Sequence, residues 1–517
     1  MITLMGIFAM AARFSVGSDT WWHLTAGRMI LEKGQILKTD PFSYTRAGAE
    51  WHYPGWLAEI GLYAVYQILG AGGLNILTAL IVTAAFGLIW FSLQGNFYLR
   101  AFLLVLAAAA SGVYWAARPY LITFLFSALY LVILEREWDW WISSPGERRG
   151  TVSFGGIGLW TLPFGMVLWA NSHGGFAVGF ILYGIYFLGI LGCTNLLADY
   201  FQIMKSAELH WKEKTALLRG NTSGLLEGFA LSWKKHLRWR RFVLVGLVMV
   251  AAVALNPFGP EMLLYPFKTV GIDALGSYID EWQPPNFHEI RIFPFLLLMG
   301  LTFGFVGASR DRISGKDFLL VGVFGTLALT AARNIALFAL ISPVVISRAG
   351  VKAWAVLRED AGWLSSSRQP ASRLNQILNF SLLLLTAAAV LYKVSLVYPE
   401  AANREYFQQV FPVDAVNYLE EEDPQGRLFN SYNWGGYLIW ELPEKPVFVD
   451  GRTDLYGDEL IEEWVEVVQA GANWQEILRD WNVDVILLEP ERPVVRLLEE
   501  NDWVLRYQDN QAVVFTK

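Results

Sequence analysis

Long apolar runs recur along this chain from its N-terminus to about Val397 and then stop. A helix needs about 20 mainly apolar residues to cross about 30 Å of hydrocarbon, and several runs approach that length. Because 54% of the 517 residues are apolar and only 17% are charged, a single water-soluble core is excluded. We therefore predict a multi-pass α-helical membrane protein over residues 1–397, followed by a separate domain over 398–517.

Apolar runs bounded by charged or turn residues predict about 11 transmembrane helices. A further segment, 56–69, is only about 14 residues long and lies between Pro54-Gly55 and Gly70, which suits an interfacial or re-entrant helix better than a span. The predicted spans are 2–16, 74–94, 99–117, 120–135, 155–170, 176–196, 241–255, 291–307, 317–331, 334–348 and 377–396.

Lys and Arg concentrate in every second loop between the predicted spans, above all in a basic loop at 198–241. The positive-inside rule makes that loop cytoplasmic, so the first loop, 17–73, and the C-terminal domain are expected on the outer side of a cytoplasmic (inner) membrane. The segment 399–517 holds only 9 of the 40 Lys and Arg but 25 of the 47 Asp and Glu. An acidic chain whose basic residues border the bilayer is not expected to bind nucleic acid.

The acidic C-terminal segment predicts a small α/β domain. Asn433–Tyr437 and Asp450–Asp454 carry the glycine and Asx residues of tight turns, which either bind sugar or seat the domain on the membrane part. Strands are predicted at 427–430, 446–449, 483–488, 503–507 and 512–515, and helices at 413–421, 459–468, 474–480 and 493–499.

Acidic residues mark the outer ends of the predicted spans, where ionisable groups are functional candidates. Asp19 follows the first span and precedes two tryptophans that exclude water, a place that suits a general base; the alternative is a helix cap assisted by Thr20. Asp40 precedes a proline and fits a turn as well as a catalytic role. Glu281 adjoins Asp280, and such like charges require a cation or a substrate nearby.

Cationic residues at the same face suit an anionic phosphate. Arg118 and Arg333 lie at the mouths of different spans, and the guanidinium fork matches phosphate oxygens, although each Arg alone also fits snorkelling to the interface. His173, between an amide and two glycines, could donate to phosphate or ligate a metal. Further polar residues at this face are candidates for supporting roles: His23, Asn171 and Asn256.

The order of these features resembles the type C (GT-C) glycosyltransferases, membrane enzymes that include protein O-mannosyltransferases, aminoarabinose transferases and oligosaccharyltransferase catalytic subunits. The resemblance is strongest to a bacterial branch of that superfamily and covers nearly the whole chain. It is carried by Asp19–Leu24, Thr39–Tyr44, Arg118-Pro119, Trp169–Gly174, Asn256–Gly259, Glu281-Trp282, Pro284-Pro285, Arg333-Asn334, Trp434–Tyr437 and Asp450–Arg452.

The resemblance implies a polyprenyl-phosphate-linked sugar as donor, an active site at the outer face and inversion at the anomeric carbon. Asp19 matches the catalytic acidic residue of the first loop, and the acceptor would be an envelope glycan, lipid or protein. Several members have Asp-Glu where this chain has Asp19-Thr20. A divalent cation, Mg²⁺ or Mn²⁺, held by Asp19 and Glu281 therefore stays an open alternative.

Two other classes of protein share some of these features. A transporter or flippase for lipid-linked glycans would have many spans, but it predicts inverted repeats and charges at mid-bilayer depth, which the sequence does not display. A non-catalytic assembly protein that binds glycans through its C-terminal domain would need no polar cluster at the span mouths.

Overall fold

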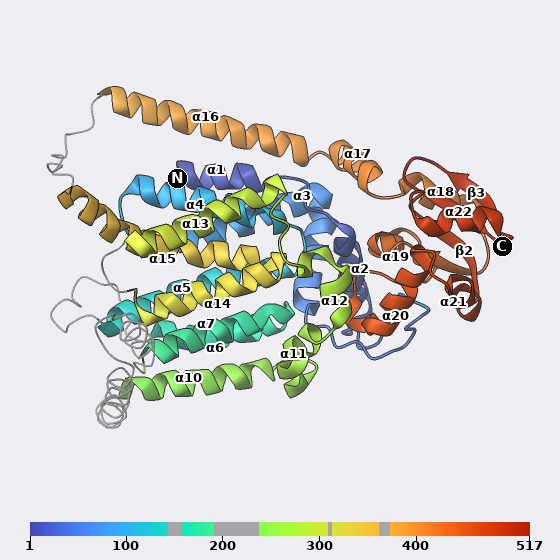
Figure 1. The fold of residues 1–517 in the computed structure, drawn as a ribbon, viewed down its shortest axis with the longest axis horizontal. Coiled ribbons are helices and arrows are strands. Elements are labelled where there is room, and N and C mark those ends of the chain that lie inside the picture. The colour runs from blue at the N-terminus through green and yellow to red at the C-terminus, as the bar shows by residue number, and fades with distance from the viewer. Residues whose placement is uncertain (143–156, 191–236, 309–312, 361–372) are drawn as a thin grey trace, which may run out of the picture.

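The computed structural model describes residues 1–142, 157–190, 237–308, 313–360 and 373–517. Long helices run side by side through most of the molecule (Figure 1). A small α/β region, residues 400–517 and here called the tail, lies at one end of these helices. The fold class expected from the sequence is thus found in outline, with a helical bundle followed by a compact C-terminal sheet.

An apolar helix lies over each predicted span. These helices are α1 (Ile2–Ala11), α3 (Trp56–Trp90), α4 (Phe97–Ser111), α5 (Tyr120–Ile142), α6 (Ile157–Ala170), α7 (Ala177–Ile190), α10 (Leu237–Val253), α13 (Phe293–Ala308), α14 (Gly315–Thr330), α15 (Ile335–Asp360) and α16 (Arg373–Val397).

Within the described residues, five helical stretches are long and apolar enough to cross a membrane. The predicted total of about 11 spans remains a prediction. The basic loop at 198–241 lies outside the described residues up to residue 236. The five stretches are Trp56–Trp90, Phe97–Tyr114, Ile290–Ala308, Ala332–Ala353 and Arg373–Val397.

Helix α3 joins the predicted interfacial helix at 56–69 to the span that follows it. The two halves meet at Gly70, whose φ of 62° and ψ of −163° are not helical and are open mainly to glycine. Two residues on, a Cβ at Gly72 would stand 2.1 Å from the carbonyl oxygen of Tyr398. Gly70 therefore allows a kink, and Gly72 allows a close backbone approach.

A buried ionic network fixes three bundle helices relative to one another. Glu135 of α5 accepts hydrogen bonds from Lys316 of α14 at 2.7 Å and from Arg348 of α15 at 2.6 Å. Arg348 also pairs with Asp317 at 2.5 Å. Removing one member would leave a buried charge unpaired, so the network holds α5, α14 and α15 in one arrangement.

The tail is built on a four-stranded sheet with the order β1-β2-β4-β3. β1 runs parallel to β2, with Leu428 opposite Val485, whereas β4 is antiparallel to both β2 and β3. The strands are β1 (Arg427–Asn430), β2 (Val483–Leu488), β3 (Val504–Gln508) and β4 (Val513–Thr516). The helices around them are α17 (Glu400–Val410), α18 (Val413–Glu422), α19 (Gly435–Glu441), α20 (Thr453–Val468), α21 (Trp474–Asp480) and α22 (Pro493–Glu500).

One strand predicted for the tail, 446–449, is not a strand. Val447, Phe448 and Val449 are buried, but the segment makes a single bridge, between Val447 and Ser43 of the first loop. The backbone of Phe448 is satisfied by side chains: its N–H donates to Asn430 at 2.8 Å, and its carbonyl accepts from Thr45 at 2.6 Å. The apolar run expected to join the sheet therefore joins the tail to the first loop instead.

Helix α2 (Ser18–Lys33) packs between α3 and α19, and its residues from Thr20 to Gly27 are buried. Trp21 and Trp22 are 1% and 4% exposed. A Cβ at Gly436 would stand 2.2 Å from the carbonyl oxygen of Ser18, so only glycine lets α19 come this close. The segment Asn433–Tyr437, predicted as a tight turn, instead forms a short 3₁₀ turn and the start of α19, and it seats the tail on the first loop.

Candidate functional site

A cluster of four charged side chains lies where the bundle meets the tail. Its centre is Arg118, which directly precedes Pro119 and the start of α5. The Arg118 guanidinium donates to Asp19 at 2.6 Å and to Glu281 at 2.9 Å. Arg333 approaches Glu281 to 3.7 Å. These four residues were named from separate stretches of sequence, and the structure brings them together.

Asp19 occupies the first turn of α2, but it does not cap that helix. The residue at the cap is Gly17, whose N–H donates to the Thr20 hydroxyl at 3.0 Å. The carboxylate of Asp19 turns to Arg118 through Oδ2. Among the described residues, its second oxygen, Oδ1, is assigned no hydrogen bond, which leaves it as the oxygen able to accept a proton.

The environments of the two carboxylates differ. Burial raises the pKa of Asp19, and the attraction of Arg118 only partly opposes this. Burial acts the same way on Glu281, but Arg118 and Arg333 together lower the pKa of Glu281 to about 2. Glu281 therefore stays a fixed negative charge, while Asp19 has the higher proton affinity that a general base needs.

Arg333 is the less engaged of the two cations. It lies in the short 3₁₀ turn Ala332–Asn334, and its guanidinium stacks over the ring of Trp282 at 4.3 Å from the centroid. Its side chain is 23% exposed, and its ion pair with Glu281 is long. Arg333 can thus turn part of its hydrogen-bonding fork toward an anionic ligand without breaking a short contact.

His173 precedes the 3₁₀ turn Gly174–Phe176 and is held by its Nδ1 atom. The N–H of Gly175 donates to Nδ1 at 3.0 Å, so Nδ1 is the acceptor and the proton of the neutral ring is on Nε2. Thr123 is 2.8 Å from the same nitrogen. Burial, then the charges of Arg333 and Arg118, lower the pKa of His173 to about 3. The ring is therefore a neutral hydrogen-bond donor at working pH.

Two cavities meet at this cluster. The first measures about 330 Å³ and reaches into the bundle, past Val178, Ile181 and Leu337. The second measures about 740 Å³ and reaches toward the tail, past Tyr432, Trp464 and Arg492. Both are lined by Leu275, Trp282, Gly451, Thr453 and the charged residues Asp19, Arg118 and Glu281. Arg333 and His173 line the first cavity.

The structure places the other named residues differently. His23 lines the first cavity, one helical turn from Asp19, and its Nδ1 is 3.0 Å from the buried Glu59. Asn171 and Asn256 line neither cavity. Asn171 accepts from Trp56 and donates to the carbonyl of Leu255, and Asn256 donates to the carbonyl of Ala170, so both amides join helix ends.

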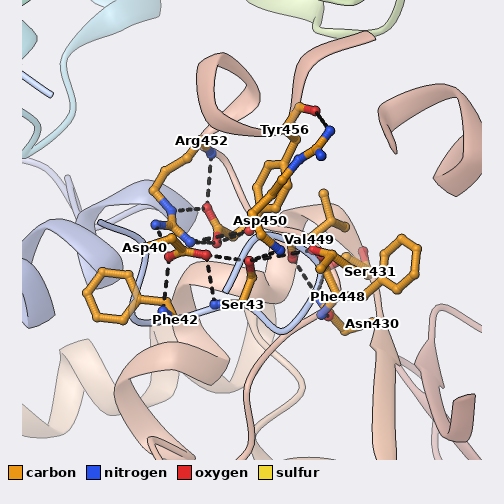
Figure 2. A network of polar contacts seen from close by, with 12 residues as sticks. Asp40, Phe42, Ser43, Asn430, Ser431, Phe448, Val449, Asp450, Arg452 and Tyr456 are labelled. Atoms are coloured by element: carbon orange, nitrogen blue, oxygen red, sulfur yellow. Dashed lines mark hydrogen bonds and ion pairs between the residues drawn. The ribbon is translucent and has the colours of Figure 1, made fainter. Parts of the chain in front are cut away.

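Asp40, the third acidic candidate, is buried away from both cavities. It accepts the N–H groups of Phe42 and Ser43 at its own turn and pairs with Arg452 of the tail at 2.6 Å (Figure 2). Its side chain is fully buried. The sequence allowed Asp40 either a turn role or a catalytic role, and its contacts in the structure are those of a turn residue.

The sequence marked Asp450–Asp454 as a turn that could bind sugar, but it did not place these residues at the first cavity and did not mark Tyr265. Asp454 of the tail accepts a hydrogen bond from Tyr265 of α11 (Tyr265–Val270) at 3.0 Å, and burial raises the pKa of Asp454. Gly451 and Thr453 border both cavities. The signal available was the segment Asp450–Asp454, but a turn motif alone does not disclose that it faces a distant loop.

The carboxylates do not fit a divalent cation. Within the residues that the structure describes, no group of three or more His, Cys, Asp and Glu side chains could hold one. The space between Asp19 and Glu281 is filled by the Arg118 guanidinium, which bonds to both. The positive charge that a metal would supply is thus already present, and we derive no step through a metal.

We therefore expect any transferase activity of the purified protein to survive chelation. Incubation with excess EDTA and removal of the chelate should leave the rate within about twofold of the untreated protein, because Arg118 and Arg333 together balance the charges of Asp19 and Glu281 without a metal. The measurement is the rate before chelation, after it, and after addition of Mg²⁺ or Mn²⁺. Loss on chelation and recovery with either ion would contradict the expectation.

No protein-family model and no curated protein sequence matches this chain. Among solved structures, it is similar to the apo oligosaccharyltransferase of Archaeoglobus fulgidus, with a TM-score of 0.54, 12% identity, and coverage of 94% of this chain and 69% of that chain.

The archaeal oligosaccharyltransferase AglB from Archaeoglobus fulgidus, in complex with an inhibitory peptide and a dolichol-phosphate, gives a TM-score of 0.53, again at 12% identity with 94% and 69% coverage. ArnT from Cupriavidus metallidurans in the apo state has a TM-score of 0.47 and 14% identity, with 98% and 95% coverage. At such identities the oligosaccharyltransferase likeness concerns the fold, and at that level the expected resemblance to GT-C membrane glycosyltransferases is confirmed.

Proposed function

We propose that this chain, whose fold is that of the GT-C membrane glycosyltransferases, transfers a sugar from a polyprenyl-phosphate donor to an acceptor hydroxyl with inversion. The observation that carries the proposal is the meeting of two cavities at one charged cluster. Both cavities include Asp19, Arg118 and Glu281 in their walls. A transfer between two substrates needs such a junction, whereas a binding protein for one ligand needs only one cavity.

The first cavity suits the donor. Its inner wall is formed by apolar side chains of bundle helices, including Ile181 of α7 and Leu337 of α15, which suit a prenyl chain. Its other wall carries Arg333 and the neutral His173, which suit a phosphate. A polyprenyl phosphate needs this arrangement, because its chain belongs in the bilayer and its charged head at the interface.

The second cavity suits the acceptor. It is the larger of the two and opens between α12 (Asp273–Tyr278) and α20 of the tail, away from the apolar wall of the first. Trp464 and Tyr432 offer aromatic faces on which a sugar ring can stack. Arg492, whose guanidinium is held by two hydrogen bonds to Glu489, adds a cation to this wall. An acceptor entering here would reach Asp19 from the side opposite the donor's lipid chain.

The chemistry then needs one displacement. The oxygen of the acceptor hydroxyl bonds to the anomeric carbon, and Oδ1 of Asp19 accepts the proton of that hydroxyl. The bond from that carbon to the phosphate oxygen breaks, and the phosphate leaves with the electron pair. Attack opposite the leaving group inverts the anomeric carbon. Arg333 and the Nε2–H of His173 stabilise the charge on the leaving phosphate, and Arg118 keeps Asp19 in place.

The test of the donor site is Arg333→Ala. The variant should raise the KM for a polyprenyl-phosphate sugar about 10- to 100-fold, because a charge-assisted hydrogen bond to a phosphate contributes about 1.5–3 kcal/mol. The fall in kcat should be smaller, since Arg118 and Asp19 keep their contact. The measurement is initial rate against donor concentration at saturating acceptor.

The matched control is Arg291→Ala, which removes an arginine that is 67% exposed and that, within the described part of the chain, pairs with Glu289 alone. It should leave the donor KM unchanged. An unchanged KM in Arg333→Ala as well would mean that Arg333 does not bind the donor phosphate.

A further inference from the structure

Three side chains form a fully buried ion triad between the first loop and the tail. The guanidinium of Arg452 donates to Asp40 of the first loop at 2.6 Å and to both oxygens of Asp450, at 2.8 and 2.6 Å (Figure 2). None of the three side chains is exposed. Tyr456 donates to Asp450 at 2.6 Å, and Ser43 to Asp40, so the excess negative charge is hydrogen-bonded.

Between two members of this triad lies Gly451, which touches Asp19. A Cβ built on Gly451 would stand 1.9 Å from Oδ1 of Asp19, closer than any real contact. Gly451 is not among the glycines of positive φ, so its backbone would accept alanine. The glycine is therefore needed for space alone, at the one oxygen of Asp19 that Arg118 does not occupy.

Further contacts hold the turn that contains Gly451 close to Asp19. Asn430 donates to the carbonyl of Val449 at 2.8 Å, and a Cβ at Gly435 would stand 2.2 Å from that same oxygen. Figure 2 shows Asn430 and Val449 close to Asp450 of the triad. The turn thus has little freedom to move away from Asp19, because both its ends are held by buried hydrogen bonds.

We propose that Gly451 keeps Oδ1 of Asp19 open to the acceptor, and that the Asp40–Arg452–Asp450 triad positions Gly451 for that task. The inference rests on the proposed function and adds the tail to the catalytic site. Gly451 and Arg452 are positioning residues. Docking of the tail on the first loop and completion of the site are then a single event, and Asp40 affects the reaction through the triad.

The test is Gly451→Ala in the full-length protein, with Gly276→Ala as the matched control, since a Cβ at Gly276 meets nothing within 4 Å. Gly451→Ala should lower kcat about 10²-fold with the donor KM within about twofold, because the methyl group displaces or covers the base while the donor cavity keeps its cation. Gly276→Ala should match the wild type. A normal kcat in Gly451→Ala would overturn the proposal.

A double-mutant cycle separates this contact from a general effect on folding. Gly451→Ala should lower the midpoint of thermal unfolding in the wild-type background, and much less in the Asp19→Ala background, where no carboxylate opposes the methyl group. Equal losses in both backgrounds would overturn the proposal. The cycle measures unfolding, so it tests the contact between Gly451 and Asp19 without any activity. A wild-type protein that transfers no sugar would refute the proposed function and leave this contact still testable.

The triad is tested by Arg452→Lys, because one ammonium group cannot bond to Asp450 and Asp40 together in the geometry of the guanidinium. We expect kcat to fall at least tenfold with little change in the donor KM. Lys445→Arg is the control, since Lys445 pairs with Asp423, a residue 65% exposed, elsewhere in the tail. A wild-type kcat in Arg452→Lys would show that the triad does not position Gly451. If that variant fails to fold, the double-mutant cycle of Gly451→Ala with Asp19→Ala decides.

Discussion

Asp19→Asn should slow sugar transfer about 10²- to 10⁴-fold, the range typical of losing a positioned general base. The amide keeps the size of the carboxylate and can still accept a hydrogen bond from Arg118, but it cannot take a proton at neutral pH. Because Gly17 and not Asp19 occupies the helix cap, the substitution should leave α2 intact. The measurement is kcat with saturating polyprenyl-phosphate sugar and acceptor.

The pH dependence provides a second readout of the same variant. Because burial raises the pKa of Asp19, the wild-type rate should fall as pH drops through that raised value, where the base becomes protonated. The residual rate of Asp19→Asn should lack this acid limb. Glu281 cannot be its source, since the pKa of Glu281 is held at about 2.

The control for Asp19→Asn is Glu32→Gln, which removes an exposed carboxylate from the other end of α2. It should leave both the rate and the pH profile unchanged. A normal transfer rate in Asp19→Asn, with the protein folded, would refute the role of Asp19 as base. A third acidic residue in the wall of the first cavity, the half-buried Asp454, would then be the residue to examine.

The helical bundle was accessible to sequence reasoning because its signal is local. An apolar run long enough for a helix is read from consecutive residues, and a helix lies over each such run. The strand predicted at 446–449 was wrong because it, too, was read from a local signal. An apolar strand-like run shows that a segment is buried, but the partner of that segment, Ser43, is some 400 residues away in the chain.

The candidate site was predictable in its charges and not in its contacts. Polar residues at the ends of apolar runs had to gather at the ends of the bundle, which is why Asp19, Arg118 and Glu281 were named and do meet. Nothing in the sequence pairs Asp40 with Arg452, because the pairing depends on how the tail docks. The space that Gly451 leaves beside Asp19 is likewise a property of tertiary packing.

Arg118→Ala should have the other large effect, on both stability and transfer. The variant leaves Asp19 and Glu281, about a fifth and a quarter exposed, facing each other without the cation that bonds to both. Removing one partner of a buried ion pair costs about 3–5 kcal/mol, and the partial exposure here places the expected loss toward the lower end of that range. Transfer should fall at least 10³-fold, because the base loses its position as well as its counter-charge.

The decisive measurement is a cycle between Arg118→Ala and Glu281→Gln. Glu281→Gln removes one of the two like charges, so adding it to Arg118→Ala should recover part of the unfolding midpoint, whereas in the wild-type background it should lower that midpoint. Transfer should stay low in the double variant, since Asp19 still lacks its partner. Arg404→Ala, which breaks a surface pair whose members are 75% and 78% exposed, should change neither quantity. If Glu281→Gln lowers the midpoint equally in both backgrounds, the two carboxylates do not share Arg118 as their cation, and the large effect expected of Arg118→Ala loses its physical basis.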